Sequence, residues 1–126
     1  MITALVSGFL VVHGLLHPGT WTAPVPSGKP PPFDPGHSWA LTAAHVSAAP
    51  VRAASLALSW YTALLYVVAG VGVVAGSDWW AGTAIVAAAS GLVLKTIWFH
   101  PWLTVGILLD MGVIVAVASS WPGPLY

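Results

Sequence analysis

Long apolar runs alternate with short polar breaks along this chain, and this pattern predicts its helices. Four runs are apolar and long enough to be candidate membrane spans: residues 2–17, 51–76, 79–99 and 102–120. A run of about 20 such residues crosses the hydrocarbon core of a bilayer as an α-helix, in which every backbone polar group is paired. We therefore predict an all-α, integral-membrane four-helix bundle, with residues 1–126 forming a single transmembrane domain.

Proline and polar residues mark where the predicted spans end. The first predicted loop spans residues 18–50, and its prolines predict extended backbone outside the hydrocarbon from Pro18 to His37. Residues 38–49 are a candidate short interfacial helix. Pro50 stands where a helix-starting proline is favoured, Asp78 is a candidate N-cap for the third span, and the His-Pro pair at 100–101 predicts a turn. The first run follows no basic segment, so we interpret it as a retained helix and not as a signal peptide.

Composition points to lipid as the solvent of this bundle. Hydrophobic residues make up 58% of the chain and charged residues 5%, whereas about a quarter of the residues of a soluble domain are charged. Eight tryptophans suit the interfacial belts of membrane proteins. The formal net charge is zero and no basic stripe exists, which argues against a nucleic-acid partner. The absence of cysteine excludes disulfides and thiolate metal sites.

The few basic residues predict an orientation. When the four spans are threaded alternately through a membrane, Lys29, Arg52 and Lys95 all fall on the side of the first loop. Lys and Arg are enriched on the cytoplasmic side, so we predict a multi-pass protein of the cell membrane, with a cytoplasmic first loop and both termini outside. The same side receives all five histidines, which are His13, His17, His37, His45 and His100.

Lys95 and Asp110 are the candidate buried polar or ion site, because both lie within predicted spans. An ionisable group at membrane depth is costly unless it is paired or faces a polar cavity. The two residues lie on consecutive spans, so an ion pair near His13 is within reach across the hairpin. Asp110 is then a proton or cation site or an anchor for a polar substrate. Alternatively, it is a structural carboxyl that Lys95 or a neighbouring hydroxyl group satisfies.

His13, His17 and His100 are the candidate metal ligands. His13 and His17 are four residues apart and share one helix face, and neutral imidazole is the commonest protein ligand of metals. Haem is a second candidate cofactor, with an axial histidine such as His100 or His45 on a facing helix. The alternative is that these side chains are polar groups near the membrane surface, each satisfied by a neighbour. The sequence itself requires no cofactor.

Small residues recur in the predicted spans at helix-packing spacing, and in lipid such residues let helices approach closely. They predict a compact bundle or an oligomer interface and are Gly72, Gly76, Ala84, Ala87, Ala88, Gly91, Gly112 and Ala116. Aromatic side chains within the second span, Trp60, Tyr61 and Tyr66, either pack against lipid and helices or line a pocket for a flat apolar ligand.

Several segments resemble known groups of membrane proteins. The segments HGLLHPGTW, FDPGHSW, WW and FHPWLTVGILLD, in this order, resemble a group of small, uncharacterised four-helix membrane proteins of high-GC bacteria. This resemblance implies a bacterial inner-membrane protein and carries no established activity. The segment GFLVVHGLLH is also similar to the first helix of DoxX-like membrane proteins, which are four-helix proteins of this size.

The sequence predicts a non-catalytic protein. It holds no Ser-His-Asp order that indicates a catalytic triad, no glycine-rich phosphate loop and no pair of carboxylates. We therefore expect a small integral-membrane accessory or interaction protein, which contacts the lipid bilayer and forms a homo-oligomer or part of a larger membrane complex. One alternative is a binding protein for a metal, haem or quinone-like ligand that uses the histidines. Another is a small oligomeric transporter or channel that uses Asp110.

Overall fold

The computed structural model describes residues 1–23, 27–28 and 34–125, and all regular structure in these ranges is helical. The elements are α1 (Ile2–Trp21), α2 (Trp39–Ala43), α3 (Ala48–Val74), α4 (Trp80–Ile97), the 3₁₀-helix η1 (Pro101–Leu103) and α5 (Thr104–Ala118). Among the described residues, four segments are long and apolar enough to cross a membrane: α1, α3, α4, and η1 continued by α5. The prediction of an all-helical chain with four such segments is confirmed.

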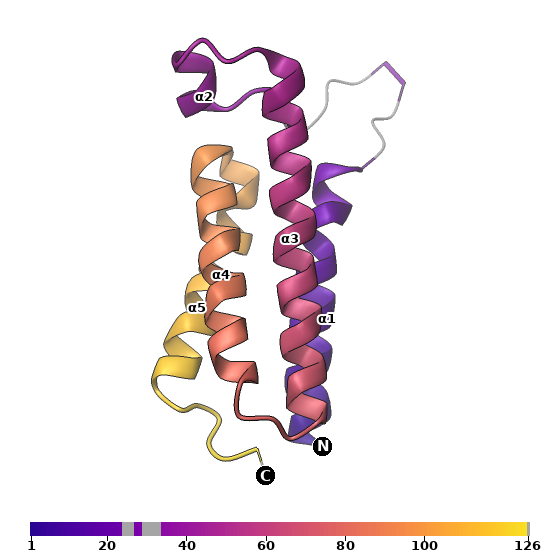
Figure 1. Cartoon of the computed structure of the whole chain (residues 1–126), viewed down its shortest axis with the longest axis vertical. Helices are drawn as coiled ribbons and strands as arrows, with labels where there is room; N and C mark the ends of the chain where they lie inside the picture. Colours follow the sequence, from indigo (N-terminus) through magenta and orange to yellow (C-terminus); the bar gives the residue numbers. More distant parts are fainter. Residues whose placement is uncertain (24–26, 29–33, 126) are drawn as a thin grey trace.

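The four long helices run up and down beside one another (Figure 1). Both termini lie at one end of the bundle, and α2 lies at the opposite end. Helix α1 packs against α3, α3 against α4, and α4 against α5. Helices α1 and α5 complete the bundle and face each other across two cavities, which residues from both helices line.

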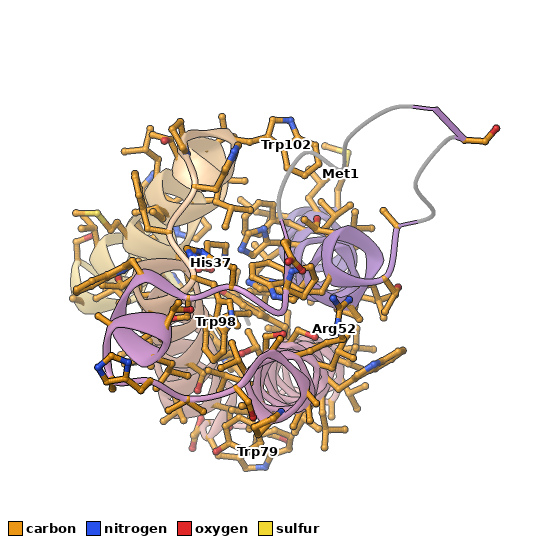
Figure 2. All side chains as sticks on the ribbon, turned by 90° about the horizontal axis from the view of Figure 1, so that it is seen from above. Met1, His37, Arg52, Trp79, Trp98 and Trp102 are labelled. Atoms are coloured by element: carbon orange, nitrogen blue, oxygen red, sulfur yellow. The ribbon has the colours of Figure 1, made fainter. Side chains whose placement is uncertain are left out.

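The interior of the bundle has two apolar clusters, one toward each end. The cluster toward the termini holds small side chains of α4 packed on α3 and comprises Leu10, Tyr66, Ala69, Val73, Ala84, Ala87, Ala88 and Val113. The cluster toward α2 comprises Trp21, Val51, Leu94, Trp98 and Leu103. Seen along the bundle, Trp98 lies inside it, whereas Trp79 and Trp102 lie on its outer surface (Figure 2). Between the two clusters, the interior is polar.

The segment before and within α2 caps the end of α4. The Ser38 hydroxyl donates a hydrogen bond to the Ile97 carbonyl at 2.5 Å, and Trp39 Nε1 donates to the Thr96 carbonyl at 2.6 Å. The last four carbonyls of a helix have no partner within the helix, so these two side chains supply missing donors. Trp98, the residue after α4, also holds this segment, because its Nε1 donates a hydrogen bond to the Pro35 carbonyl at 3.0 Å. The segment from Asp34 to Trp39 is therefore a cap on the bundle.

Asp34 connects this cap to α3. Its Oδ1 accepts a hydrogen bond from the Gly36 amide at 2.8 Å and another from Arg52 at 3.1 Å. The Arg52 and Asp34 side chains are both 53% exposed, so the ion pair adds little stability by itself and mainly positions the turn. Lys29 and the prolines at 24, 26 and 30–32 lie outside the described residues.

Helix α1 continues through Pro18 to Trp21, past the predicted end at residue 17. Proline usually ends a helix because it lacks an amide donor, which leaves the carbonyl four residues earlier unpaired. Here the ring of His17 replaces that donor, since its Nδ1 lies 3.2 Å from the Gly14 carbonyl oxygen. The predicted first loop therefore contains the last turn of α1, all of α2 and the start of α3. A second boundary also differs, because α4 begins after Trp79 without a side-chain cap, so the predicted N-cap at Asp78 is wrong.

Candidate functional site: a buried polar cluster between four helices

The Asp110 carboxylate is the centre of the polar interior. It is fully buried, and it accepts three hydrogen bonds from side chains of the other three long helices. Oδ1 accepts from His13 Nε2 on α1 at 2.7 Å and from the Tyr66 hydroxyl on α3 at 2.6 Å. Oδ2 accepts from Lys95 Nζ on α4 at 2.6 Å. With His17, these residues form what we call the Asp110 cluster: His13, His17, Tyr66, Lys95 and Asp110.

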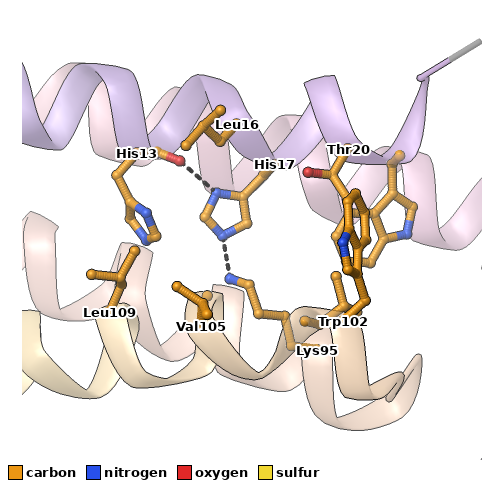
Figure 3. Close-up of a pocket in the computed structure, with 11 residues that line it drawn as sticks. His13, Leu16, His17, Thr20, Lys95, Trp102, Val105 and Leu109 are labelled. Carbon is orange, nitrogen blue, oxygen red and sulfur yellow. Dashed lines mark hydrogen bonds between the residues drawn. The ribbon is translucent and has the colours of Figure 1, made fainter. Parts of the chain in front are cut away.

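His17 connects the lysine to the backbone of α1. Its Nε2 lies 2.6 Å from Lys95 Nζ, and its Nδ1 lies 3.0 Å from the carbonyl oxygen of His13 (Figure 3). A carbonyl only accepts hydrogen bonds, so Nδ1 carries the hydrogen. Nε2 of the neutral ring then carries a lone pair, which accepts a hydrogen bond from the Lys95 ammonium group. The helix-internal Pro18 therefore assists in fixing the tautomer of His17, because it frees the Gly14 carbonyl for Nδ1.

His13 has the opposite tautomer. Its Nε2 donates to the Asp110 carboxylate, so Nε2 carries the hydrogen. Lys95 already balances the charge of Asp110, so a second hydrogen on the ring would bury an unpaired positive charge; the ring is therefore neutral, and Nδ1 carries a lone pair. This Nδ1 is buried and has no hydrogen-bond partner among the described residues. The ring itself is held in place, because it packs edge-on against Tyr66 and stacks on Phe9. A buried polar atom without a partner costs free energy, so it requires an explanation.

Three glycines make room for the Asp110 cluster. A Cβ atom at Gly91 would collide with Oδ2 of Asp110, and one at Gly14 would collide with Cβ of Tyr66. At Gly106, a Cβ atom would lie 2.6 Å from Cε of Lys95. The absence of a side chain at these positions lets the helices approach until side chains of all four long helices meet at one carboxylate.

The cluster borders a cavity of about 190 Å³ between α1 and the α4–α5 pair. His13, His17 and Lys95 point into this gap (Figure 3), and Trp21 and Trp102 supply aromatic walls. Three of the lining side chains, Leu16, Val105 and Trp102, are at least half exposed, so the cavity opens on the outer surface of the bundle. Leu109 also lines a second, apolar cavity of about 520 Å³, which extends between α1 and α5 toward the termini.

The cluster is electrically balanced. Lys95 contributes one positive charge and Asp110 one negative charge, and the tautomers above leave both histidines neutral. A buried ion pair loses its hydration, and hydrogen bonds to the remaining lone pairs and protons compensate for that loss. Asp110 receives this compensation from His13 and Tyr66, and Lys95 receives it from His17.

The donor set partly fits a metal ion. One ligand atom each from His13, His17 and Asp110 lies within 4.8 Å of the others, and all three residues are buried. However, Lys95 Nζ lies 2.6 Å from both His17 Nε2 and Asp110 Oδ2, where an ion bound to those atoms would lie. A histidine that binds a metal through one ring nitrogen usually donates a hydrogen bond from the other. His17 meets this condition, because its Nδ1 donates to the His13 carbonyl, whereas Nδ1 of His13 has no acceptor among the described residues. The ammonium group is therefore the cation of this site.

A haem site fits less well. Axial histidines in a bundle come from facing helices, whereas both buried histidines, His13 and His17, lie on α1. His100 is half-buried at the start of η1, where its Nδ1 accepts from the Trp102 amide at 3.1 Å. His37 and His45 are exposed near α2. The structure therefore groups His13 and His17 with Lys95 and Asp110, and it leaves the third predicted metal ligand, His100, outside the cluster.

Sequence reasoning did not predict the role of Tyr66 as a donor to Asp110. The signal is a polar stripe on α3, in which Ser55, Ser59, Thr62 and Tyr66 recur at spacings of four, three and four residues. All four side chains are buried. A stripe of this period on an otherwise apolar helix marks the face that turns toward the polar interior.

No family model, curated protein or solved structure matches this chain. Both resemblances noted from the sequence therefore remain predictions.

Proposed function

We propose that this chain is a multi-pass integral membrane protein. Large apolar side chains cover the outside of the bundle, and examples more than 57% exposed are Leu5, Val12, Leu64, Val71, Val105, Leu108 and Val115. The buried set includes an ion pair and two histidines. A protein in water shows the opposite distribution, and lipid is the solvent that an apolar exterior requires.

We also propose that the α2 end faces the cytoplasm and that the termini face the outside. Arg52 lies at the α2 end of α3 and supports this orientation through the positive-inside rule. Lys95 is a weaker indicator, because its ammonium group is engaged inside the bundle by Asp110. Its charge pairs with a carboxylate instead of remaining at the membrane surface.

Within the membrane, we propose that the protein binds a lipid-soluble small molecule without catalysing a reaction. The observation that carries this proposal is Nδ1 of His13, a buried ring nitrogen without a hydrogen-bond partner among the described residues, which lies beside a cavity that opens between α1 and α5. A ligand that placed a hydrogen-bond donor there would satisfy the atom. The apolar rim of the cavity would shield the polar end of that ligand from lipid.

A channel or transporter based on Asp110 receives less support. The carboxylate is fully buried and already accepts three hydrogen bonds, so an ion or proton that bound there would have to displace Lys95, His13 or Tyr66. Asp110 is also not among the residues that line the 190 Å³ cavity.

A purely structural role is the second candidate, and the geometry of the cluster favours it in one respect. Each of the four long helices contributes a side chain to the hydrogen bonds around Asp110. Such a network fixes the relative positions of the helices and would suit an accessory protein that presents a rigid surface to a partner. The ligand proposal and the structural proposal differ in whether the cavity is occupied.

Native mass spectrometry tests the ligand proposal on protein purified in mild detergent and then incubated with a total membrane lipid extract. We expect one small molecule per chain in the wild type. Val105→Trp would fill the cavity, so we expect it to abolish occupancy. Val115→Trp is the matched control, because Val105 and Val115 are both on α5 and are 67% and 63% exposed, but Val115 lines neither cavity. Equal occupancy in the two variants, or no occupancy in the wild type, would contradict the proposal and favour the structural role.

A further inference from the structure

We infer that the ligand is an uncharged phenol or hydroquinone that carries a hydrocarbon tail and enters sideways from the bilayer between α1 and α5. This inference rests on the proposed binding function and names its ligand class. It follows from four properties of the site: the hydrogen-bonding state of two atoms, the charge of the cluster, the size of the cavity and the apolar groove that continues it.

The first of the two atoms is Nδ1 of His13, which requires a hydrogen-bond donor. The neutral ring of His13 carries its hydrogen on Nε2, which donates to Asp110. The buried Nδ1 therefore carries a lone pair and can only accept a hydrogen bond. A ketone, an ester or an oxidised quinone offers oxygen lone pairs to this atom and leaves it unsatisfied. A hydroxyl group donates to it.

The second atom is Nζ of Lys95, which requires an acceptor. An ammonium group has three N–H bonds, and Asp110 and His17 accept two of them. One N–H therefore remains for a ligand oxygen in the cavity that Lys95 lines. A hydroxyl group both donates and accepts through one oxygen, so it is the smallest group that offers what His13 and Lys95 each require.

The charge of the cluster selects an uncharged ligand. Lys95 and Asp110 already balance each other, with Nζ and Oδ2 at 2.6 Å. A carboxylate or phosphate ligand would leave a net negative charge buried between the helices, and a cation would leave a net positive charge. Either is costly at low dielectric. Phenolic hydroxyl groups are neutral near pH 7, because their ordinary pKa is about 10.

The size of the cavity matches a single ring. Its volume is about 190 Å³, and a protein cavity of about 150 Å³ accommodates a benzene molecule. Trp21 and Trp102 line it and offer flat surfaces for aromatic packing. A fused system of several rings would exceed this space.

The second cavity has room for the hydrocarbon tail of the ligand. It shares Leu109 with the first, has a volume of about 520 Å³ and is lined mainly by apolar side chains. On α1 its lining extends from Phe9 and Leu10 back to Ile2, about 10 Å along the helix at 1.5 Å per residue. On α5 it passes Gly112, where no atom lies near an added Cβ, so a hydrocarbon chain has room there.

Paired probes test this inference on the full chain in lipid nanodiscs. 4-Decylphenol and 4-decylanisole share ring and tail, but only the phenol can donate a hydrogen bond. We expect saturable, one-to-one binding of the phenol, measured by the quenching of tryptophan fluorescence and by calorimetry. We expect the anisole to bind at least about tenfold more weakly, because it leaves His13 Nδ1 buried without a donor.

Two variants locate the tail without touching the polar cluster. Gly112→Leu would fill the apolar cavity and should weaken 4-decylphenol binding about tenfold or more. Gly82→Leu is the matched control, because Gly82 lies on α4, lines neither cavity and has no atom near an added Cβ. Equal affinity for phenol and anisole would overturn the hydroxyl assignment, and equal affinity of the two variants would overturn the groove.

The two levels of the proposal fail in distinguishable ways. If neither probe binds but native mass spectrometry finds another lipid-soluble molecule that Val105→Trp removes, the ligand class is wrong and the binding function stands. If the wild type holds no small molecule under any of these conditions, the binding function itself is wrong.

Discussion

Lys95 and Asp110 lie 15 residues apart on neighbouring antiparallel helices, and Nζ of the lysine contacts Oδ2 of the aspartate at 2.6 Å. The aspartate is fully buried and the lysine is 4% exposed. The turn at His100 and η1 reverses the chain between them, so α4 and α5 pair as a hairpin whose two ionisable residues meet inside the bundle.

Removing one partner of this ion pair should destabilise the fold far more than removing both. Lys95→Met leaves a buried carboxylate without its counter-charge, and Asp110→Asn leaves a buried ammonium group. We expect each to lower the free energy of unfolding by about 3–5 kcal/mol. The double variant buries no unpaired charge and should lose about 2 kcal/mol or less, because the amide that replaces the carboxylate still has an acceptor oxygen. Reversible denaturant unfolding in detergent micelles measures all three, and additive losses would show that the two charges are not coupled.

The two buried histidines should show opposite tautomers. His17 carries its hydrogen on Nδ1, because two backbone carbonyls lie against that atom, and His13 carries its hydrogen on Nε2, because Asp110 accepts there. Nitrogen-15 NMR of histidine-labelled protein separates protonated from unprotonated ring nitrogens. The same tautomer for both rings would contradict the assignment.

Pro18→Ala tests why His17 has this tautomer. The alanine amide would donate to the Gly14 carbonyl and take over one of the two bonds that Nδ1 now makes. We expect α1 to remain helical and the Nδ1–H tautomer of His17 to lose population. An unchanged nitrogen-15 spectrum would show that the His13 carbonyl alone is sufficient.

Gly91 should tolerate no side chain, because a Cβ atom there collides with Asp110 and approaches His17 Nε2 to 3.0 Å. Gly91→Ala should lower the free energy of unfolding by about 1–3 kcal/mol through overpacking at the carboxylate. Gly82→Ala on the same helix meets open space and should be neutral or stabilising by up to about 1 kcal/mol, since alanine favours helix. Parallel unfolding of the two variants separates the collision from the general effect of replacing glycine.

Sequence reasoning predicted the four long helices because a long apolar run is a strong local signal for a helix. It also placed Lys95 and Asp110 on consecutive spans, so their pairing followed from the hairpin. It did not predict Tyr66 as a donor to Asp110, because that contact joins residues 44 positions apart and depends on how α3 is rotated in the bundle. The polar stripe that ends at Tyr66 contained this information in part.

Two other differences arise from side chains that replace backbone partners. Pro18 was expected to end the first span, but the ring of His17 supplies the donor that proline lacks, and α1 continues. Ser38 and Trp39 were expected only to begin a short interfacial helix, yet they cap α4 more than 50 residues later. Such contacts depend on tertiary position, which local sequence patterns do not encode.

Removing the ammonium group should convert the Asp110 cluster into a metal site. In Lys95→Ala, Asp110 would lose its counter-charge, and the position 2.6 Å from both His17 Nε2 and Asp110 Oδ2 would become free for a cation. A divalent ion suits the two imidazoles and carboxylate that remain. We therefore expect Co²⁺ to bind this variant with visible absorption bands and Zn²⁺ to displace it, whereas the wild type purifies without a Soret band or stoichiometric metal. Asp110→Asn in the same background should abolish Co²⁺ binding. Stoichiometric metal in the wild type would instead show that Lys95 moves aside and that His13 and His17 are native ligands.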